Sequence, residues 1–233
     1  MGRRFCDLRV FPKICGGEDN IEDFLKTAVL LKFKVLAFPI LNQSSIVFSK
    51  IQRYAKAYRI DYVMRADIVS GNLRYIKRKA EFYRKKVELI TVIPLNISTA
   101  RLAARDSRID IINFERFWDF LDTRQAKMMK RNEKILEVSI NSVIKASIRQ
   151  KTILFKKMYK ALTIASRYDI PIIVSSGARN IYEMRDPRTL ASFLYLFEIN
   201  TLQYKVVSEI PVNLIEKNRE RLENEIVRGV KMG

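Results

Sequence analysis

The stretch 170-IPIIVSSGARNIYEMRDPRTL-190 decides the fold, because it joins a strand, a tight loop and a helix start. An apolar, β-branched run, 170–174, ends in four small residues, 175–178, and Arg179 follows at once. Asp186 and Pro187 have the residue types of a helix N-cap and a first helical position. Small residues after a strand leave backbone N–H groups free to form an anion nest. The stretch therefore predicts a strand–loop–helix unit whose loop could hold the phosphate of a small substrate, a nucleotide or a nucleic acid.

The same alternation of strand and helix continues along all 233 residues. Amphipathic segments such as Ile148–Tyr168 separate short β-branched runs. Eight such units favour a parallel sheet, and eight strands close a barrel. We therefore predict an α/β chain, a TIM-like (β/α)8 barrel, as a single domain over residues 1–233. The stretch 214–230 is predicted to be the closing C-terminal helix, with docking of a partner subunit as the alternative. The predicted strands are Phe5–Val10, Val35–Phe38, Tyr62–Val69, Glu88–Ile93, Ile109–Asn113, Ile135–Ile140, Pro171–Ser175 and Tyr204–Ser208.

The net charge indicates the kind of partner. There are 44 Lys and Arg against 25 Asp and Glu, which gives +19 and an isoelectric point near 10.0. A basic balance of this size favours a nucleic acid. A membrane surface is less favoured, because no basic amphipathic helix stands apart and no run reaches the ~18 apolar residues of a membrane span. The N-terminus also lacks the apolar core of a signal peptide. We expect a cytoplasmic, RNA- or DNA-binding protein.

Acids and arginines share strand faces that should be largely apolar. Asp7 lies two residues from Arg9, Arg65 lies two residues from Asp67, and Glu137 is in the sixth predicted strand. One hypothesis is a metal-dependent phosphoesterase that uses Asp7, Asp67 and Glu137 at the barrel mouth. The other is that these charges pair with one another. The chain has no histidine, the commonest general base and metal ligand, which favours pairing. A carboxylate-only magnesium site stays open.

A dense basic segment, 72-NLRYIKRKAEFYRKK-86, is the clearest candidate for phosphate binding. It holds seven basic residues, one acid and three aromatic residues. On a helix, Arg74, Lys77 and Arg78 lie together and make a face able to track phosphates. The alternative is a solvated helix. Further basic clusters, including Arg101–Arg108, suit a large, shaped polyanion.

Five segments together resemble the ribonuclease P protein component 3 family, the thirty-kilodalton subunit family of archaea and eukaryotes. They are FCDLRV, RADIV, ARLAARDSRIDIINF, KILEVSI and IPIIVSSGARNIYEMRDPRTLASFLYLF. The resemblance runs from about residue 4 to about residue 210. It implies an eight-stranded TIM-like barrel related to polymerase-and-histidinol-phosphatase type barrels, without their metal ligands. One departure is Phe197-Glu198-Ile199, where a Leu-Gly-like close is expected before the eighth strand.

The resemblance also implies a function. The chain would be a subunit of the ribonucleoprotein that removes the 5′ leader of precursor tRNA. It would have no catalytic side chain, metal or cofactor of its own, while the holoenzyme needs Mg. Its partners would be ribonuclease P RNA, protein component 2 and the other ribonuclease P proteins. The resemblance suggests RNA contacts at four arginines: Arg65, Arg101, Arg105 and Arg179. The basic helix described above adds three further candidates: Arg74, Lys77 and Arg78.

Overall fold

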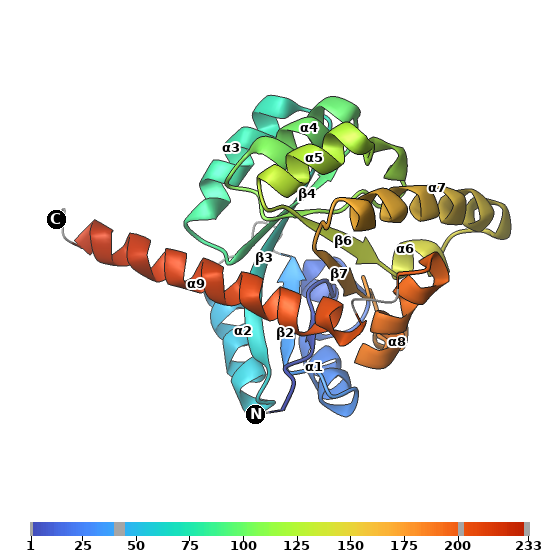
Figure 1. Cartoon of the computed structure of the whole chain (residues 1–233). Coiled ribbons are helices and arrows are strands. Elements are labelled where there is room, and N and C mark those ends of the chain that lie inside the picture. Colours follow the sequence, from blue (N-terminus) through green and yellow to red (C-terminus); the bar gives the residue numbers. More distant parts are fainter. Residues whose placement is uncertain (1, 40–44, 200–202, 231–233) are drawn as a thin grey trace.

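A computed structural model describes residues 2–39, 45–199 and 203–230 of the chain. Seven parallel strands form a nearly closed barrel in which each strand pairs with the one before it in sequence (Figure 1). This confirms the TIM-like α/β fold. The strands are β1 (Cys6–Asp7), β2 (Val35–Pro39), β3 (Asp61–Ser70), β4 (Leu89–Pro94), β5 (Ile111–Ile112), β6 (Ile135–Ser139) and β7 (Ile172–Ser175).

Helices surround the barrel, and side chains at their starts fix where several of them begin. Asn72, Asn96, Asp122 and Ser147 each accept a hydrogen bond from a backbone N–H of the first helical turn. Asp186 does the same for α8, with Pro187 as the first helical residue, which confirms that prediction. The α-helices are α1 (Ile21–Leu30), α2 (Ser45–Ala57), α3 (Leu73–Arg84), α4 (Ile97–Arg105), α5 (Thr123–Arg131), α6 (Asn141–Ile144), α7 (Ile148–Arg167), α8 (Pro187–Ser192) and α9 (Glu209–Val230). Short 3-10 turns are η1 (Lys13–Cys15), η2 (Trp118–Phe120), η3 (Ile181–Glu183), η4 (Phe193–Phe197) and η5 (Gln203–Val207).

Every second strand residue points into the barrel. The successive inward residues of each strand form two layers of side chains. Near the N-terminal ends of the strands the inward side chains are apolar and buried, as at Val63, Leu89 and Ile173. Two residues further along the same strands the inward side chains are polar, as at Arg65 and Ser175. The apolar layer supplies burial, and the polar layer lies toward the C-terminal mouth, where barrel proteins place their sites.

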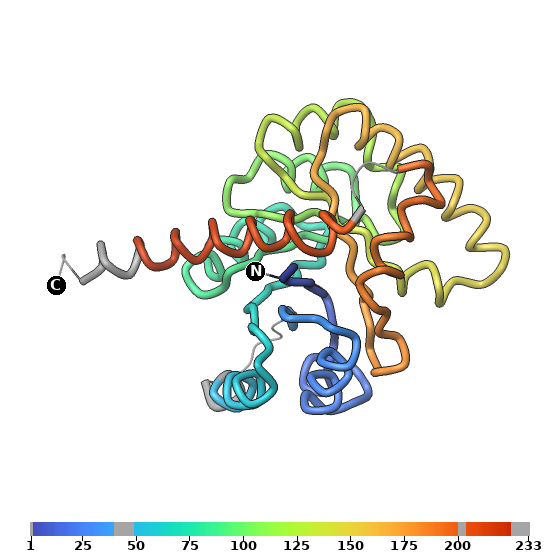
Figure 2. The backbone as a smooth tube through the Cα atoms, turned by 60° about the horizontal axis from the view of Figure 1, so that its bottom comes forward, coloured from blue at the N-terminus to red at the C-terminus, as the bar shows by residue number. Residues whose placement is uncertain are grey.

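Helix α9 covers the N-terminal end of the barrel. Ile215 is buried in the same apolar cluster as the inward residues of the strands. Arg219 pairs with Asp61 at 2.8 Å and with Glu88 at 3.3 Å, next to the starts of β3 and β4. The far part of the helix runs past the body of the barrel (Figure 2). The segment predicted as a closing helix therefore packs under the barrel opening, and it begins earlier, at Glu209.

The predicted eighth strand, Tyr204–Ser208, is wrong, since this segment forms the 3-10 turn η5. Its Val206 and Val207 are buried, so the apolar pattern correctly indicated burial, but in a 3-10 turn and not in a strand. Just beyond β1 and β7 the two chain segments pair with each other, at the bridge Val10–Ala178 and through the Gly177 N–H, which donates to the Arg9 carbonyl at 2.9 Å. An eighth strand between them would have to break these bonds, and the segment makes local hydrogen bonds instead. Before it, Glu198 takes the left-handed conformation, φ 61°, where the family resemblance expects a glycine.

Candidate nucleic-acid interface

The loop after β7 already holds an anion, and that anion is the chain's own Asp7. The Ser176 N–H donates to Asp7 Oδ1 at 3.1 Å. The Gly177 N–H donates to the Arg9 carbonyl at 2.9 Å, and the Ala178 N–H donates to Ser176 Oγ at 3.1 Å. These N–H groups are therefore engaged inside the protein. The prediction of a nest for an external phosphate is wrong at these positions.

Gly177 is the one position in this loop where a side chain does not fit. Its φ is 68°, and a Cβ there would lie 2.1 Å from Ser139 Oγ. The tight approach of the loop to β6 therefore requires glycine.

Arg65 lies in the polar layer of the barrel interior and is fully buried. Its Nη1 and Nη2 donate to the Glu137 carboxylate at 2.7 and 2.6 Å. Its Nε donates to Asp67 Oδ1 at 2.6 Å, and Nη1 also reaches the Leu8 carbonyl at 2.8 Å. An RNA phosphate has no access to a guanidinium with 0% exposure, so the expected RNA contact at Arg65 is corrected to an internal ion pair.

Arg9 and Glu137 make further contacts of the same kind, whereas Asp7 forms no salt bridge in the described chain. Arg9 Nε donates to Asp67 Oδ2 at 3.0 Å, and Arg9 Nη2 lies 2.7 Å from Glu115. Glu137 further accepts hydrogen bonds from Asn113 Nδ2 at 2.9 Å and from Ser175 Oγ at 3.0 Å. The hypothesis of mutually paired charges is thus confirmed for these groups.

The carboxylates of the phosphoesterase alternative are not arranged as a metal site. Within the described residues, no group of three or more His, Cys, Asp or Glu side chains is placed to hold a metal ion. Asp67 and Glu137 already face guanidinium groups, and Asp7 faces the backbone of the β7–α8 loop. The geometry gives these three carboxylates a structural task.

Two buried carboxyl groups of this interior have pKa values shifted in opposite directions. Burial alone would raise the pKa of Glu137, but the Arg65 guanidinium overrides it and holds the pKa at about 2. Burial raises the pKa of Asp7 to about 6, because the hydrogen bonds that its carboxylate accepts from Ser176 and from the Arg9 N–H do not offset the loss of solvent. Asp7 Oδ2 is buried without a hydrogen-bond partner. Glu137 is therefore a stabilising anion, while Asp7 is a costly one at neutral pH.

The exposed cations of α3 have a different environment. Arg74, Lys77 and Arg78 are all exposed, and none forms a salt bridge within the described part of the chain. Nearby, Lys86 Nζ lies 3.5 Å from the ring centroid of Phe82, which is 51% exposed. This helix presents uncompensated positive charge together with exposed aromatic surface.

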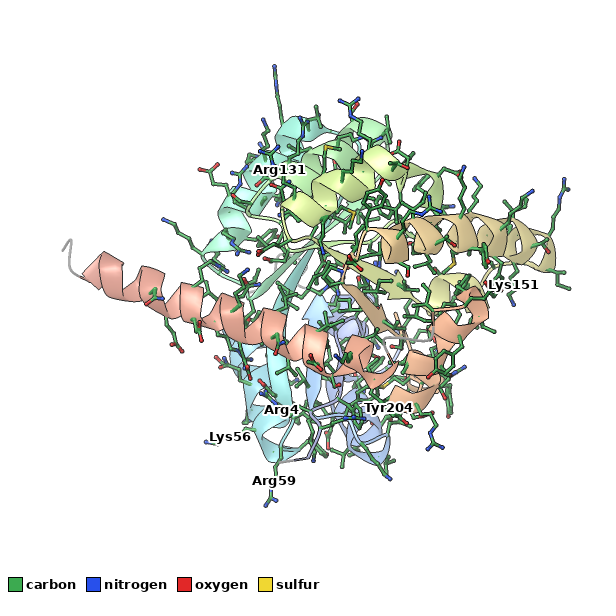
Figure 3. The ribbon with its side chains drawn as sticks, in the orientation of Figure 1. Arg4, Lys56, Arg59, Arg131, Lys151 and Tyr204 are labelled. Carbon is green, nitrogen blue, oxygen red and sulfur yellow. The ribbon has the colours of Figure 1, made fainter. Side chains whose placement is uncertain are left out.

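The predicted contacts on α4 divide into one structural and one exposed residue. The Arg101 guanidinium pairs with Asp122 and donates to Gln125 Oε1 at 3.0 Å, which ties α4 to α5. Arg105 is exposed and donates from Nε to the Arg101 carbonyl at 3.2 Å. Helices α3, α4 and α5 lie side by side, and Arg131 of α5 is on the same side of the molecule (Figures 1 and 3). Arg105 therefore joins the α3 cations on one surface, and Arg101 mainly holds that surface together.

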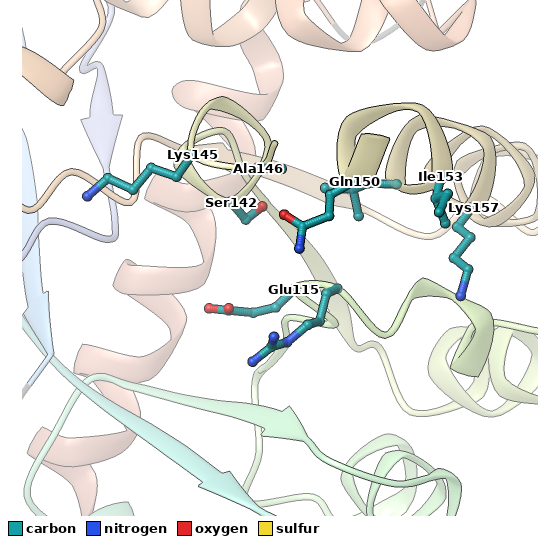
Figure 4. Close-up of a pocket in the computed structure, with 9 residues that line it drawn as sticks. Glu115, Ser142, Lys145, Ala146, Gln150, Ile153 and Lys157 are labelled. Atoms are coloured by element: carbon teal, nitrogen blue, oxygen red, sulfur yellow. The ribbon is translucent and has the colours of Figure 1, made fainter. Parts of the chain in front are cut away.

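Arg179 lies apart from this surface, at the C-terminal mouth of the barrel. It is exposed, its Nη1 donates to the Gly16 carbonyl at 3.0 Å, and its guanidinium carbon lies 5.0 Å from the Phe11 ring centroid. Sequence reasoning missed Arg116, which lines the same cavity as Arg179. A second cavity of about 350 Å³, lined also by Glu115 and Lys157, adjoins it on the side of α6 and α7 (Figure 4).

The fold and these side chains define a TIM-like barrel whose interior arginines are paired with carboxylates and whose outer surface is basic. The chain belongs to the RNase P subunit p30 family, whose model matches residues 4–223.

The chain is also similar in sequence to curated proteins named ribonuclease P protein component 3. The chain is 24% identical over 148 residues to ribonuclease P protein component 3 of Methanococcus maripaludis strain C5, covering 62% of this chain and 64% of that protein. It is 23% identical over 175 residues to the protein of the same name from Methanococcoides burtonii, covering 74% and 72%. The match thus spans just under two thirds of the Methanococcus maripaludis protein.

Solved structures resemble the chain in fold. A chain of an archaeal ribonuclease P cryo-EM structure with mature tRNA matches with a TM-score of 0.79 and 17% identity, over 91% of this chain and 90% of that one. An ochratoxinase from A. niger matches with a TM-score of 0.59 and 9% identity, over 88% and 69%. At these identities the likeness concerns the barrel fold alone.

We predict that Glu137→Gln lowers the free energy of unfolding by about 3–5 kcal/mol, because it leaves the buried Arg65 without its main counter-charge. Urea unfolding measures the change. The double variant Arg65→Met/Glu137→Leu removes both charges and should be more stable than the single variant. A Glu137→Gln protein as stable as the wild type would show that the pair is not needed.

We predict that Asp7→Asn becomes progressively more stabilising, relative to the wild type, between about pH 4 and pH 6. The folded-state pKa of about 6 lies above the ordinary value of 3.8, so the folded chain binds this proton more tightly. Wild-type stability therefore falls as pH rises through this window, by on the order of 3 kcal/mol. Urea unfolding at several pH values measures it. Asp169→Asn, at an 85% exposed side chain, is the control, and parallel curves for both variants would contradict the prediction.

Proposed function

We propose that this chain is a protein subunit of ribonuclease P, which removes the 5′ leader of precursor tRNA. In this proposal it binds the catalytic RNA through exposed arginines and lysines and supplies no catalytic side chain. The observation that carries it is the division of charge in the barrel. The carboxylates at the mouth face arginines or backbone N–H groups, while Arg74, Lys77 and Arg78 on the exposed face of α3 form no salt bridge within the described chain.

The mechanism follows from RNA electrostatics. Each exposed cation that neutralises a phosphate releases condensed counterions and makes close packing of RNA helices less costly. Arg74, Lys77, Arg78 and Arg105 are the residues we assign to this task on the α3–α4 surface, with Arg179 at the barrel mouth. The catalytic magnesium would be held by the RNA, and the protein would favour the active RNA shape.

The proposal includes partners. We propose protein component 2 as the direct protein partner, beside the ribonuclease P RNA and the other proteins of the particle. We also propose that the particle works in the cytoplasm. In the described residues, no helix combines the length and the apolar character that crossing a membrane requires.

We predict that the purified chain with magnesium leaves precursor tRNA uncut, and that adding it to the RNA and the other protein subunits raises cleavage. Single-turnover cleavage of a precursor tRNA, with and without the chain, measures this. The control is an assembly that contains every component except this chain. Robust cleavage by the chain alone, after strict removal of RNA, would contradict the proposal.

We predict that replacing Arg74, Lys77 and Arg78 together by Gln lowers the magnitude of the log–log salt slope of RNA binding by about 2–3, since each phosphate contact contributes about 0.7–0.9. Filter binding across a salt series measures the slope. A matched control replaces three exposed cations, Lys34, Lys56 and Arg59, two of which lie at the opposite end of the molecule (Figure 3). Equal slopes for the two triple variants would exclude α3 as the RNA-binding helix.

A further inference from the structure

The C-terminal mouth of the barrel holds a cavity of about 370 Å³, of which the proposed function uses only the rim residue Arg179. The C-terminal ends of β2, β3 and β4 and the segments that follow β1, β4, β5 and β7 contribute to it. Its volume lies near the lower end of the range for small-ligand pockets, about 300–1,000 Å³, which suits a ligand of nucleotide size. The lining side chains that carry the argument are Arg9, Phe11, Asp67, Arg116, Phe117 and Arg179.

Two cations at this cavity lack an acidic partner. Arg116 is exposed and forms no salt bridge within the described residues. Arg179 is exposed, and its guanidinium donates to the neutral Gly16 carbonyl. By contrast, Arg9 is buried and its charge is taken by two carboxylates. Positive charge that is free to meet a phosphate therefore lies at Arg116 and Arg179.

Flat surfaces line the same cavity. The guanidinium carbon of Arg179 lies 5.0 Å from the Phe11 ring centroid, and that of Arg116 lies 5.8 Å from the Phe117 ring centroid. Phe117 is stacked on Phe120 at 5.3 Å with an interplanar angle of 4°, which holds the ring in place. Unpaired RNA bases stack on aromatic rings and on guanidinium planes alike. The cavity thus offers a prepared surface for a base.

The remaining polar groups of the cavity are acceptors. Asp67 reaches it with a carboxylate that is 7% exposed, and Glu115 reaches it with one that is 35% exposed. Carboxylates repel a bare phosphate but accept hydrogen bonds from the N–H groups of a base. Acceptors beside flat surfaces, with free cations nearby, match a nucleotide better than an isolated anion.

We propose that this cavity binds one unpaired nucleotide of RNA, with the base against Phe117 and the flanking phosphates at Arg116 and Arg179. This inference rests on the proposed function, because it assumes that RNA is the chain's ligand. It adds a base-sized site for single-stranded RNA to the phosphate contacts proposed for the α3–α4 surface. Stacking of a base on an aromatic side chain contributes about 1–3 kcal/mol by alanine substitution, which corresponds to about 5- to 150-fold in affinity.

The test compares a short single-stranded oligoribonucleotide with a fully paired RNA duplex, both binding to the purified full chain in a fluorescence anisotropy titration. Phe117→Leu is expected to weaken single-strand binding by about 5-fold or more and to leave duplex binding unchanged. Arg116→Gln is expected to lower the magnitude of the salt slope for the single strand by about 0.7. Because Arg116 is exposed and unpaired in the described chain, this second variant keeps the test valid if Phe117→Leu folds poorly.

Matched controls are Tyr195→Leu, an exposed aromatic residue on η4, and Lys56→Gln, an exposed cation on α2. Both should bind like the wild type. Pocket variants that behave like these controls would overturn the proposal. So would displacement of the single strand by inorganic phosphate as readily as by a nucleoside monophosphate at equal ionic strength, which would reveal a simple anion site. Failure of the proposed function is seen separately, as reconstituted cleavage that does not depend on the chain.

Discussion

The buried ion pair between Arg65 and Glu137 is the interaction on which the barrel interior depends. It joins β3 to β6 across the lumen, and a buried charge is tolerated only when its hydrogen-bonding groups are satisfied. Asn113 and Ser175 donate further hydrogen bonds to the Glu137 carboxylate. The Asp67 carboxylate accepts hydrogen bonds from both Arg65 and Arg9. The polar layer below the mouth of the barrel, where barrel enzymes place their catalytic groups, thus consists of side chains that stabilise one another.

The outer surface follows the opposite rule. A net charge of +19 makes the folded chain repel itself, and the acids of the barrel interior are held by arginines of the same interior rather than by the cations of the surface. Cations such as Lys77 and Arg78 have no acidic partner in the described chain, and in the proposed function a polyanion would supply that partner. The interior and the surface use the same basic residue types, and the difference lies in whether a carboxylate is near.

Periodicity predicted the seven strands and the long helix Ile148–Arg167, because apolar spacing directly reports which face is buried. It could not separate a strand from a 3-10 turn at Tyr204–Ser208, since five residues are too few to show a period. The pairing of Arg65 with Asp67 was predicted from their shared face. The complete burial of Arg65 was not predicted, so Arg65 was also assigned to RNA contacts. The Arg101–Asp122 pair joins residues 21 apart in sequence, and such proximity is visible only after folding.

The position of α9 has a consequence for how the chain is made. Each strand pairs with the strand synthesised just before it, so the sheet can grow in step with translation. The apolar layer at its N-terminal end stays open until Ile215 arrives from the last helix, and Arg4, near the other terminus, pairs with Glu216 of that same helix. Segments more than 200 residues apart in sequence are thereby joined, and the N-terminal end of the barrel can be covered only once α9 has been synthesised.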